Sequence, residues 1–289
     1  MRFPYFPGCT LNTTAKGFDN SLRASTQVLG LELVELPEWN CCGATFPLLV
    51  DNVLDLAGPA RVLVAARETG ERLAVACTTC YNVLRRTNHA LAADDDRREK
   101  LNFFIEAEYN GDLQIFDVLQ LLRDEIGFEK IARMVKKPLS GLKAAAYYGC
   151  MVLRPPAEVA YDDPENPSTL DDLLIALGAE TVGYAHKAEC CGSYLAIVSA
   201  VAASEMTHTI LSSAHNNGAK LMVTNCPLCQ FNLDKHQAEL SRRHAGFQSI
   251  PVFYFSQLLA MALGLDTLDF GWDKHYVDPQ PILTILRSR

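Results

Sequence analysis

Ten cysteines divide this chain of 289 residues into two copies of one pattern. Each copy has a single cysteine, then an adjacent pair, then a Cys-x-x-Cys motif, with 34 residues between the pair and the motif. The gap before the pair is 31 residues in the first copy and 39 in the second. The first set is Cys9, Cys41, Cys42, Cys77 and Cys80, and the second is Cys150, Cys190, Cys191, Cys226 and Cys229. Because no cysteine is left over, the spacing indicates a duplicated unit.

The residues around the cysteines repeat as well. FPGC at 6–9 matches YYGC at 147–150, and NCCG at 40–43 matches ECCG at 189–192. Each copy closes on a related segment, IFDVLQLL in the first and VFYFSQLL in the second. A repeat of about 140 residues is a duplicated domain, not a solenoid, whose units are much shorter. We therefore expect an N-terminal domain over residues 1–140 and a C-terminal domain with a tail over residues 141–289.

Strands and helices are expected to alternate in both halves. Short apolar runs lead into the first cysteine and into the Cys-x-x-Cys motif of each half, at residues 1–6, 73–76, 144–148 and 220–224. Helical segments follow, among them 21–29 and 168–177, the latter with Ser168 or Thr169 placed to cap it. This order predicts an α/β fold of two Rossmann-like βαβ halves related by a pseudo-two-fold axis. Ligands of such sheets gather at the carboxyl ends of the strands, so the cysteine-bearing segments should converge there, between the halves.

Two further segments carry expectations of their own. The loop at 154–167 holds four prolines and begins four residues after Cys150, which suggests either a lid over the second site or an ordinary surface loop. The tail from residue 266 has little periodicity and should wrap onto a partner or onto the core.

Charge and hydropathy exclude several classes of function. The formal net charge is −8 and no block of lysine and arginine stands out, which argues against nucleic-acid binding and against an anionic membrane surface. The longest apolar run, Tyr194 to Ala203, is too short to insert through a bilayer. The first ten residues lack the features of a signal peptide, so a cytoplasmic location is expected. Thiols stay reduced there, and clustered cysteines are then typical of metal ligands.

Five thiols per set fit an iron–sulfur cluster better than zinc. A structural zinc ion takes four ligands, and adjacent cysteines on an extended backbone point in different directions, so one ion seldom uses both. A cluster presents several irons and can bind both. Gly43 and Gly192 follow the pairs and permit the left-handed backbone and close approach that a cluster needs. Zinc in one set, or thiol redox chemistry without metal, stays open on these grounds.

The doubled motif resembles the CCG-domain family, and within it the heterodisulfide reductase B subunits. The resemblance extends over nearly the whole chain, through YYGC at 147–150, DDPENPSTLDDL at 162–173 and NCPLCQFNLDKHQ at 225–237. It implies that each set of five cysteines binds one non-cubane [4Fe-4S] cluster. It also implies that a small-molecule disulfide is reduced, or reversibly formed, between the two clusters, with electrons supplied by a ferredoxin-like C subunit and a flavin-containing A subunit.

Proton donors and substrate charge are further expectations. His89 and His186 lie close in sequence to ligands of their halves and are candidate catalytic proton donors to a departing thiolate. An anionic disulfide, such as the methanogen mixed disulfide with its sulfonate and phosphate, would need basic residues. The nearest in sequence to the ligands are Lys143, Arg154, Lys187, Arg85 and Arg86.

A different class of function stays open. Some CCG subunits belong to complexes for sulfur oxidation, hydroxy-acid oxidation or thiol-dependent fumarate reduction, where such a subunit relays electrons without a disulfide substrate. The completeness of both sets favours the enzyme. The chain shows no GxGxxG or P-loop, so no nucleotide or flavin site is expected on it.

Overall fold

Two parallel sheets with one strand order form the framework of the computed structural model, which describes residues 1–44, 52–266 and 269–287. The first sheet has the order β2-β1-β3-β4 and the second β6-β5-β7-β8, and every pairing is parallel. The strands are β1 (Arg2–Phe6), β2 (Glu32–Glu35), β3 (Arg72–Val75), β4 (Gln114–Asp117), β5 (Lys143–Tyr147), β6 (Glu180–Thr181), β7 (Leu221–Thr224) and β8 (Val252–Tyr254). The α/β fold of two Rossmann-like halves is confirmed.

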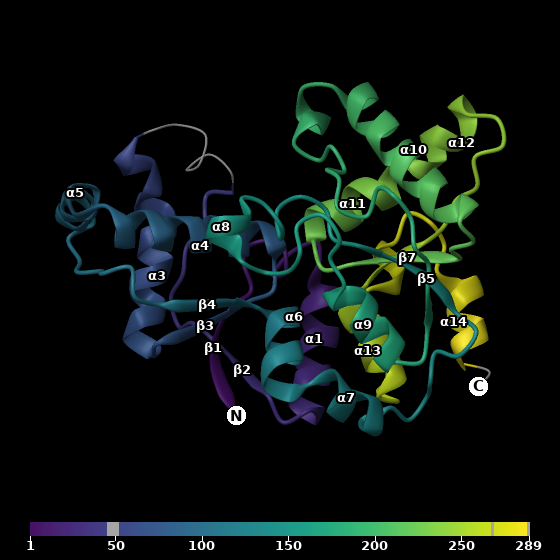
Figure 1. Cartoon of the computed structure of the whole chain (residues 1–289), viewed down its shortest axis with the longest axis horizontal. Helices are drawn as coiled ribbons and strands as arrows, with labels where there is room; N and C mark the ends of the chain where they lie inside the picture. The colour runs from purple at the N-terminus through teal and green to yellow at the C-terminus, as the bar shows by residue number, and fades with distance from the viewer. Residues whose placement is uncertain (45–51, 267–268, 288–289) are drawn as a thin grey trace.

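Helices connect and cover the strands of both sheets (Figure 1). In the first half they are α1 (Lys16–Val28), η1 (Val53–Leu56), α3 (Ala57–Thr69), α4 (Thr78–Ala93), α5 (Asp95–Ile105), α6 (Val118–Leu121), η2 (Leu122–Ile126) and α7 (Phe128–Met134). In the second half they are α8 (Pro156–Val159), α9 (Thr169–Ala176), η3 (Leu195–Ile197), α10 (Ala200–Asn216), α11 (Pro227–Lys235), α12 (Gln237–Arg243), α13 (Phe255–Ala262), η4 (Trp272–Lys274) and α14 (Gln280–Arg287). Because helices cover the sheets, central strands such as β7 (LMVT) are buried along their whole length.

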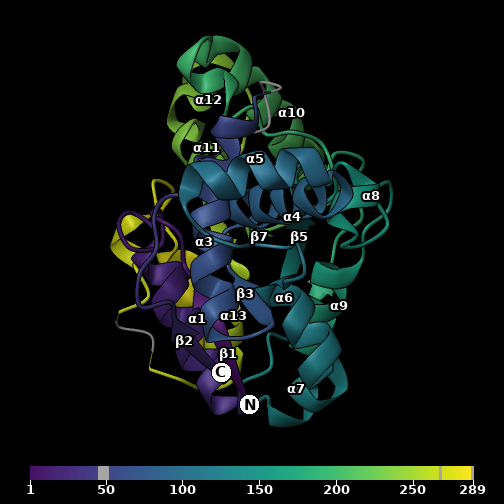
Figure 2. The same cartoon turned by 90° about the vertical axis from the view of Figure 1, so that its left-hand side faces the viewer.

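The halves pack against each other through equivalent helices. Helix α1, which follows the first strand of its half, packs against α13, which follows the last strand of the other half (Figure 2). Helix α9 of the second half packs in the same way against α6 and α7 of the first. These reciprocal contacts follow the pseudo-two-fold relation that the repeat predicts. Phe18 stacks on Tyr254 with ring centroids 4.6 Å apart, and the hydroxyls of Ser21 and Ser256 lie 2.6 Å apart.

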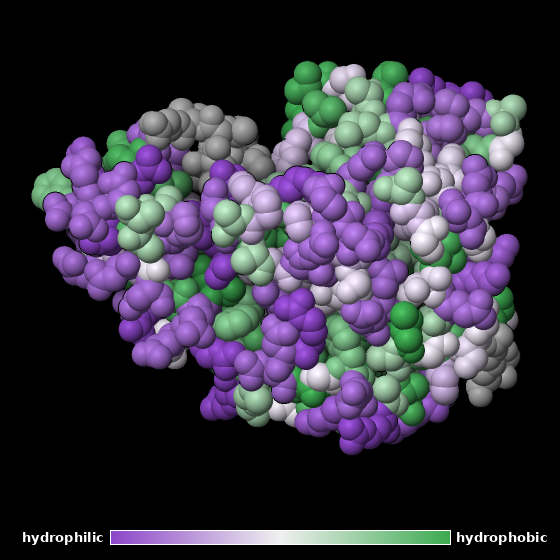
Figure 3. Space-filling view, in the orientation of Figure 1, coloured by the Kyte–Doolittle hydropathy of each residue, from purple (hydrophilic) through white to green (hydrophobic). Residues whose placement is uncertain are grey.

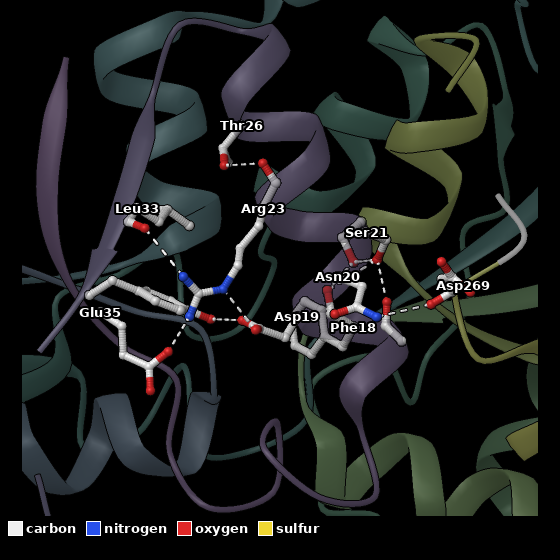
Figure 4. Close-up of polar contacts among 12 residues, drawn as sticks. Phe18, Asp19, Asn20, Ser21, Arg23, Thr26, Leu33, Glu35 and Asp269 are labelled. Atoms are coloured by element: carbon white, nitrogen blue, oxygen red, sulfur yellow. Dashed lines mark hydrogen bonds and ion pairs between the residues drawn. The ribbon is translucent and has the colours of Figure 1, made fainter. Parts of the chain in front are cut away.

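A cluster of polar contacts fixes α1 on its own sheet (Figure 4). The Arg23 guanidinium donates to Asp19 at 2.8 Å, to the Leu33 carbonyl at 3.3 Å and to Glu35 at 2.7 Å. The hydroxyl of the fully buried Tyr5 on β1 donates to Asp19 at 2.7 Å. One arginine therefore ties α1 to β2, while the opposite face of the helix packs on α13.

The 154–167 segment and the C-terminal tail both pack against the body of the protein. The backbone of the 154–167 segment accepts a hydrogen bond from the Tyr81 hydroxyl at Val159, 2.9 Å, and Glu158 pairs with Arg86 at 2.8 Å. The segment thus packs on α4 of the first half, and its role as a lid stays a prediction. The tail packs on the core, because the Gln257 amide donates to the Phe270 carbonyl at 2.8 Å.

The cap of α9 differs from the expectation. Ser168 is the N-cap residue, but its hydroxyl donates to Asp172 instead of accepting from the helix backbone. The Asp162 carboxylate accepts from the backbone N–H groups of Ser168 and Thr169, at 2.9 and 2.8 Å. A carboxylate is a stronger acceptor than a hydroxyl and complements the positive end of the helix dipole, which explains the substitution.

No helix within residues 1–44, 52–266 and 269–287 has both the length and the apolar character needed to cross a membrane.

Gly17 of α1 lies against the backbone of the tail, so Gly17→Ala is expected to destabilise the protein. A Cβ at this position would lie 2.2 Å from the Phe270 carbonyl oxygen, so the backbone of the tail would have to move. We expect the free energy of unfolding in urea to fall by about 1–3 kcal/mol. The matched control is Gly58→Ala, the second residue of α3 as Gly17 is of α1. Among the described residues its Cβ would meet nothing closer than 3.6 Å, so stability should stay equal or rise slightly. Equal losses in the two variants would contradict this account.

Candidate metal centres

The cysteines follow strand ends at the point where the strand order of each sheet reverses. Cys9 comes three residues after β1 and Cys77 two residues after β3, and these two strands are neighbours. In the second half Cys150 follows β5 and Cys226 follows β7 at the same offsets. At such a position the connections leave the sheet in opposite directions and open a crevice at the carboxyl edge. The convergence expected from the sequence is therefore present in both halves.

Within each set, the second cysteine of the pair meets the last cysteine of the Cys-x-x-Cys motif. The sulfurs of Cys42 and Cys80 are 3.2 Å apart, and those of Cys191 and Cys229 are 3.5 Å apart. All four side chains are buried, yet none forms a disulfide. Burying reduced thiols in direct contact is typical of a ligand shell, because thiols are weak hydrogen-bonding groups that gain little from each other.

Two cysteines of each set form the outer part of the site, while Cys77 and Cys226 are buried like the inner thiols. Cys9 and Cys41 are exposed, with their sulfurs 4.0 Å apart, while Cys150 and Cys190 are half-buried. The Cys190 sulfur also accepts from the backbone N–H of Gly192 at 3.3 Å. The first set is therefore more open at its surface than the second.

Glycines bring the backbone close to the sulfurs. Gly43 and Gly192 have φ of 81° and 82°, so the left-handed conformation expected from the sequence is confirmed. Sequence reasoning missed Gly8 and Gly149, although the shared FPGC and YYGC segments contain the signal. Both are left-handed too, and a Cβ at Gly8 would lie 2.9 Å from the Cys80 sulfur. A side chain there would enter the space of the ligand shell.

Contacts between the thiols lower the pKa of one partner and raise that of the other. The hydrogen bond between Cys42 and Cys80 lowers the pKa of Cys42 and raises the pKa of Cys80. In the second set, the hydrogen bond from the Cys150 thiol lowers the pKa of Cys190 to about 6. At least one thiol of each set thus has a lowered pKa, which favours the thiolate, the form that binds metals.

A buried junction joins the two sets. The hydroxyl of Thr78, next to Cys77, donates to the backbone carbonyl of Asn225, next to Cys226, at 3.0 Å. The Asn225 amide points back toward the first half, where it lies 3.5 Å from the Asp117 carboxylate. Burial raises the pKa of Asp117 to about 7. Sequence reasoning missed all three of these residues, since only their positions next to cysteines or at a strand end hint at a role.

The donor chemistry fits an iron–sulfur cluster better than a single zinc ion. Four sulfurs around one zinc ion lie roughly 3.8 Å apart. In the part of the chain that the structure describes, no three thiols lie mutually within 4.8 Å, although a Glu205–His208–His244 group elsewhere does meet that limit. Five thiols spread over a wider shell suit a centre with several metal atoms.

The two candidate histidines lie in different surroundings. His186 is half-buried and begins the segment that leads to Cys190, with its Nδ1 2.9 Å from the Glu189 carboxylate, though not in hydrogen-bonding geometry. His89 is exposed on α4, nine residues beyond Cys80. A catalytic role for either residue stays a prediction.

Comparisons with known proteins agree with this site. The model of the family described as "CCG: Cysteine-rich domain" matches residues 3–85 and 144–234. A protein of Wolinella succinogenes, named 8-methylmenaquinol:fumarate reductase membrane anchor subunit, is 33% identical over 96% of this chain and 97% of its own. The B subunit of a ferredoxin/F420H2-dependent CoB-CoM heterodisulfide reductase from Methanosarcina acetivorans is 30% identical over 94% of this chain and 92% of its own.

A solved structure shares the fold. A hypothetical protein from Helicobacter pylori superposes with a TM-score of 0.76 at 14% identity, over 95% of this chain and 51% of that chain. The two regions that match the family model contain all ten cysteines, so the chain belongs to the cysteine-rich CCG domain family.

Proposed function

We propose that this chain is an electron-transferring iron–sulfur subunit of an oxidoreductase complex, and that it reduces, or reversibly forms, a disulfide between two clusters. The observation that carries the proposal is the pair of complete five-thiol sets joined through Thr78 and Asn225. Reduction of a disulfide takes two electrons and two protons and yields two thiols. Two sites at one junction can supply the electrons one at a time.

Each half would hold one non-cubane [4Fe-4S] cluster, in domains that we divide at residue 140. In the first domain the ligands are Cys9, Cys41, Cys42, Cys77 and Cys80, and in the second Cys150, Cys190, Cys191, Cys226 and Cys229. Bound clusters supply single electrons and iron atoms that accept a thiolate sulfur. The chain's own contribution is to position two such centres, to leave outer cysteines accessible, and to keep the inner ones away from water.

A complex is supported by the relatives and by the surface. The Wolinella and Methanosarcina proteins are both named as subunits of reductases. Apolar side chains are exposed directly after the second cysteine pair, on η3 and the start of α10, with Ile197 93% and Val198 86% exposed (Figure 3). Such a patch is typical of a protein interface. We propose a ferredoxin-like C subunit and a flavin-containing A subunit as the partners.

An electron relay without a disulfide substrate is the second candidate. The name of the Wolinella relative couples a quinol to fumarate and mentions no disulfide. The junction between the sets is also packed, since Thr78 and Asn225 are each 1% exposed. Close packing suits electron transfer between two centres whether or not a disulfide binds between them.

Iron content tests the ligand assignment. Anaerobically prepared protein should contain about eight irons with equal sulfide, about four for each set. Cys42→Ser and Cys191→Ser are matched variants that remove one equivalent inner ligand from either set, and each should lose about half of the iron. Zinc in place of iron, or loss of all iron from one single variant, would contradict two independent clusters.

Thiol-dependent paramagnetism separates the disulfide reductase from the relay. Oxidised protein given a substrate thiol and a one-electron reductant should develop a new electron paramagnetic resonance signal that the reductant alone does not produce, because a thiolate held at iron would stabilise the half-reduced state. The Cys191→Ser variant should lose this signal if the second set binds the sulfur. Spectra that stay unchanged over a panel of thiols would favour the relay.

His186 and His89 are the proposed proton donors, and we favour His186 because the carbonyl of its neighbour Lys187 accepts from the N–H of Gly149, next to Cys150, at 3.2 Å. His186→Gln should lower the rate of disulfide reduction by about 10²-fold. His89→Gln is the comparison variant and should have the smaller effect. A larger loss of rate in His89→Gln than in His186→Gln would assign the role to His89 instead.

A further inference from the structure

One cavity lies between the halves, beside segments that carry cysteines of both sets. Its volume is about 570 Å³, and its lining residues fall within 10–17, 227–231, 254–257 and 270–276. We name it the junction cavity; its described lining does not include Thr78 or Asn225 of the buried junction described above. Thr10 on one wall adjoins Cys9, and Pro227 and Leu228 on another lie between Cys226 and Cys229. A molecule in this cavity would contact one cysteine-bearing segment from each half.

The cavity is not a simple product of the duplication. Its pseudo-symmetric counterpart would lie between the loop after Cys150 and the Cys-x-x-Cys helix of the first half. Those two elements are in direct contact, because the Asn82 amide donates to the carbonyls of Met151 and Arg154, both at 2.7 Å. Between the loop after Cys9 and the Cys-x-x-Cys helix of the second half the space stays open, and the tail forms its outer wall.

The tail is firmly held in that position. The Tyr276 N–H donates to the buried Asp234 carboxylate at 2.7 Å, and the Asn20 amide donates to the Asp269 carbonyl at 3.1 Å. The ring of Trp272 packs on Phe253 with centroids 5.7 Å apart. The wall is thus part of the core and not a loose terminus.

The lining is nearly without charge. Its buried polar side chains are neutral and bonded to one another, as in the hydrogen bond of 3.1 Å from Tyr254 to Gln230. Burial lowers the pKa of His275 to about 4, so this ring is neutral at pH 7. Among the described lining residues, Lys274 alone is cationic at that pH, and it pairs with Asp273 at 2.7 Å.

Aromatic rings stand at the rim. Phe231 and Tyr276 are 43% and 58% exposed and form an edge-to-face pair with centroids 5.8 Å apart. The Lys235 ammonium lies over the Phe231 ring at 4.8 Å, outside the lining itself. Exposed rings at an opening favour an apolar ligand, since part of their surface leaves water when it binds.

The basic residues near the cysteines lie outside this cavity. Its described lining includes none of Lys143, Arg85, Arg86, Arg154 and Lys187. Arg86, Arg154 and Lys187 contact Glu158, Glu165 and Asp171 at 2.8, 2.9 and 3.8 Å. An anionic substrate would therefore lose its hydration and gain only Lys274, whose ammonium already pairs with Asp273, which is unfavourable.

We propose that the junction cavity holds the apolar body of an uncharged thiol or disulfide, so that this chain selects neutral substrates over anionic ones. The inference rests on the proposed function, because it names the substrate class of the same site. It departs from the anionic mixed disulfide that the resemblance suggests.

Binding is measured with Trp272 fluorescence in cluster-loaded Trp39→Phe protein, which retains Trp272 as its one tryptophan. Trp272 lies 5.9 Å from the ring of His275 in the lining. The probes are dibenzyl disulfide, which is neutral, and bis(2-sulfoethyl) disulfide, which is anionic. Dibenzyl disulfide should quench the Trp272 fluorescence saturably, with half-saturation at a concentration at least about tenfold lower than that of the anionic disulfide. Equal affinities, tighter binding of the anion, or no saturable quenching by the neutral probe would overturn the inference.

Phe231→Arg places a cation at the rim and should reduce the preference for the neutral probe by about tenfold. Phe103→Arg is the matched control, an exposed phenylalanine on α5 of the first half, and it should leave the preference unchanged. Equal effects of the two variants would count against the cavity.

Phenylmethanethiol and 2-mercaptoethanesulfonate in paramagnetic resonance test the chemistry separately from binding. The neutral thiol should produce the new signal at the lower concentration if the cavity selects the substrate of the clusters. Silence with both thiols, together with selective quenching by the neutral disulfide, would refute disulfide reduction and leave the cavity's selectivity standing.

Discussion

The parallel arrangement of the strands is the constraint on which the rest of the structure depends. Parallel strands end at one edge of the sheet, so residues far apart in sequence meet there without long excursions of the chain. Cys9 and Cys77 are separated by 67 residues, yet both follow neighbouring strands β1 and β3. The same relation holds for Cys150 and Cys226. Ten thiols can therefore be brought into two groups by short loops alone.

The duplication supplies two such sheet edges, and the helix contacts between the halves fix the position of one edge relative to the other. If the halves were joined only by the segment at 136–142, the sites could move apart. Instead α1 and α9 each pack on helices of the opposite half, and Phe18 stacks on Tyr254 across the boundary. The distance between the sets is thus determined by the core, which suits any function in which the two act together.

Most of the framework could be predicted from the sequence because it follows from local patterns. Apolar runs predict the strands, and the spacing of cysteines predicts the duplication and the converging edge. The positive φ of Gly43 follows from its place after a cysteine pair. Contacts between the halves could not be predicted this way. Thr78 and Asn225 are ordinary polar residues in sequence, and their hydrogen bond exists only once the two sheets are docked. At the α9 cap the Asp162 carboxylate accepts in place of the Ser168 hydroxyl, which depends on how the loop between the two residues folds.

The departures from symmetry carry the information about specificity. A perfect repeat would give two equal openings beside the cysteines or none. Here the chain after Cys150 closes one with its own backbone, through the amide of Asn82. The tail walls the other and leaves about 570 Å³ beside the segment that carries Cys226 and Cys229. Ligand geometry is shared between the halves, as the matched Cys42–Cys80 and Cys191–Cys229 contacts show, whereas the surroundings differ. The metal-binding chemistry that we propose would thus follow from what the halves share, and the proposed choice of substrate from what they do not.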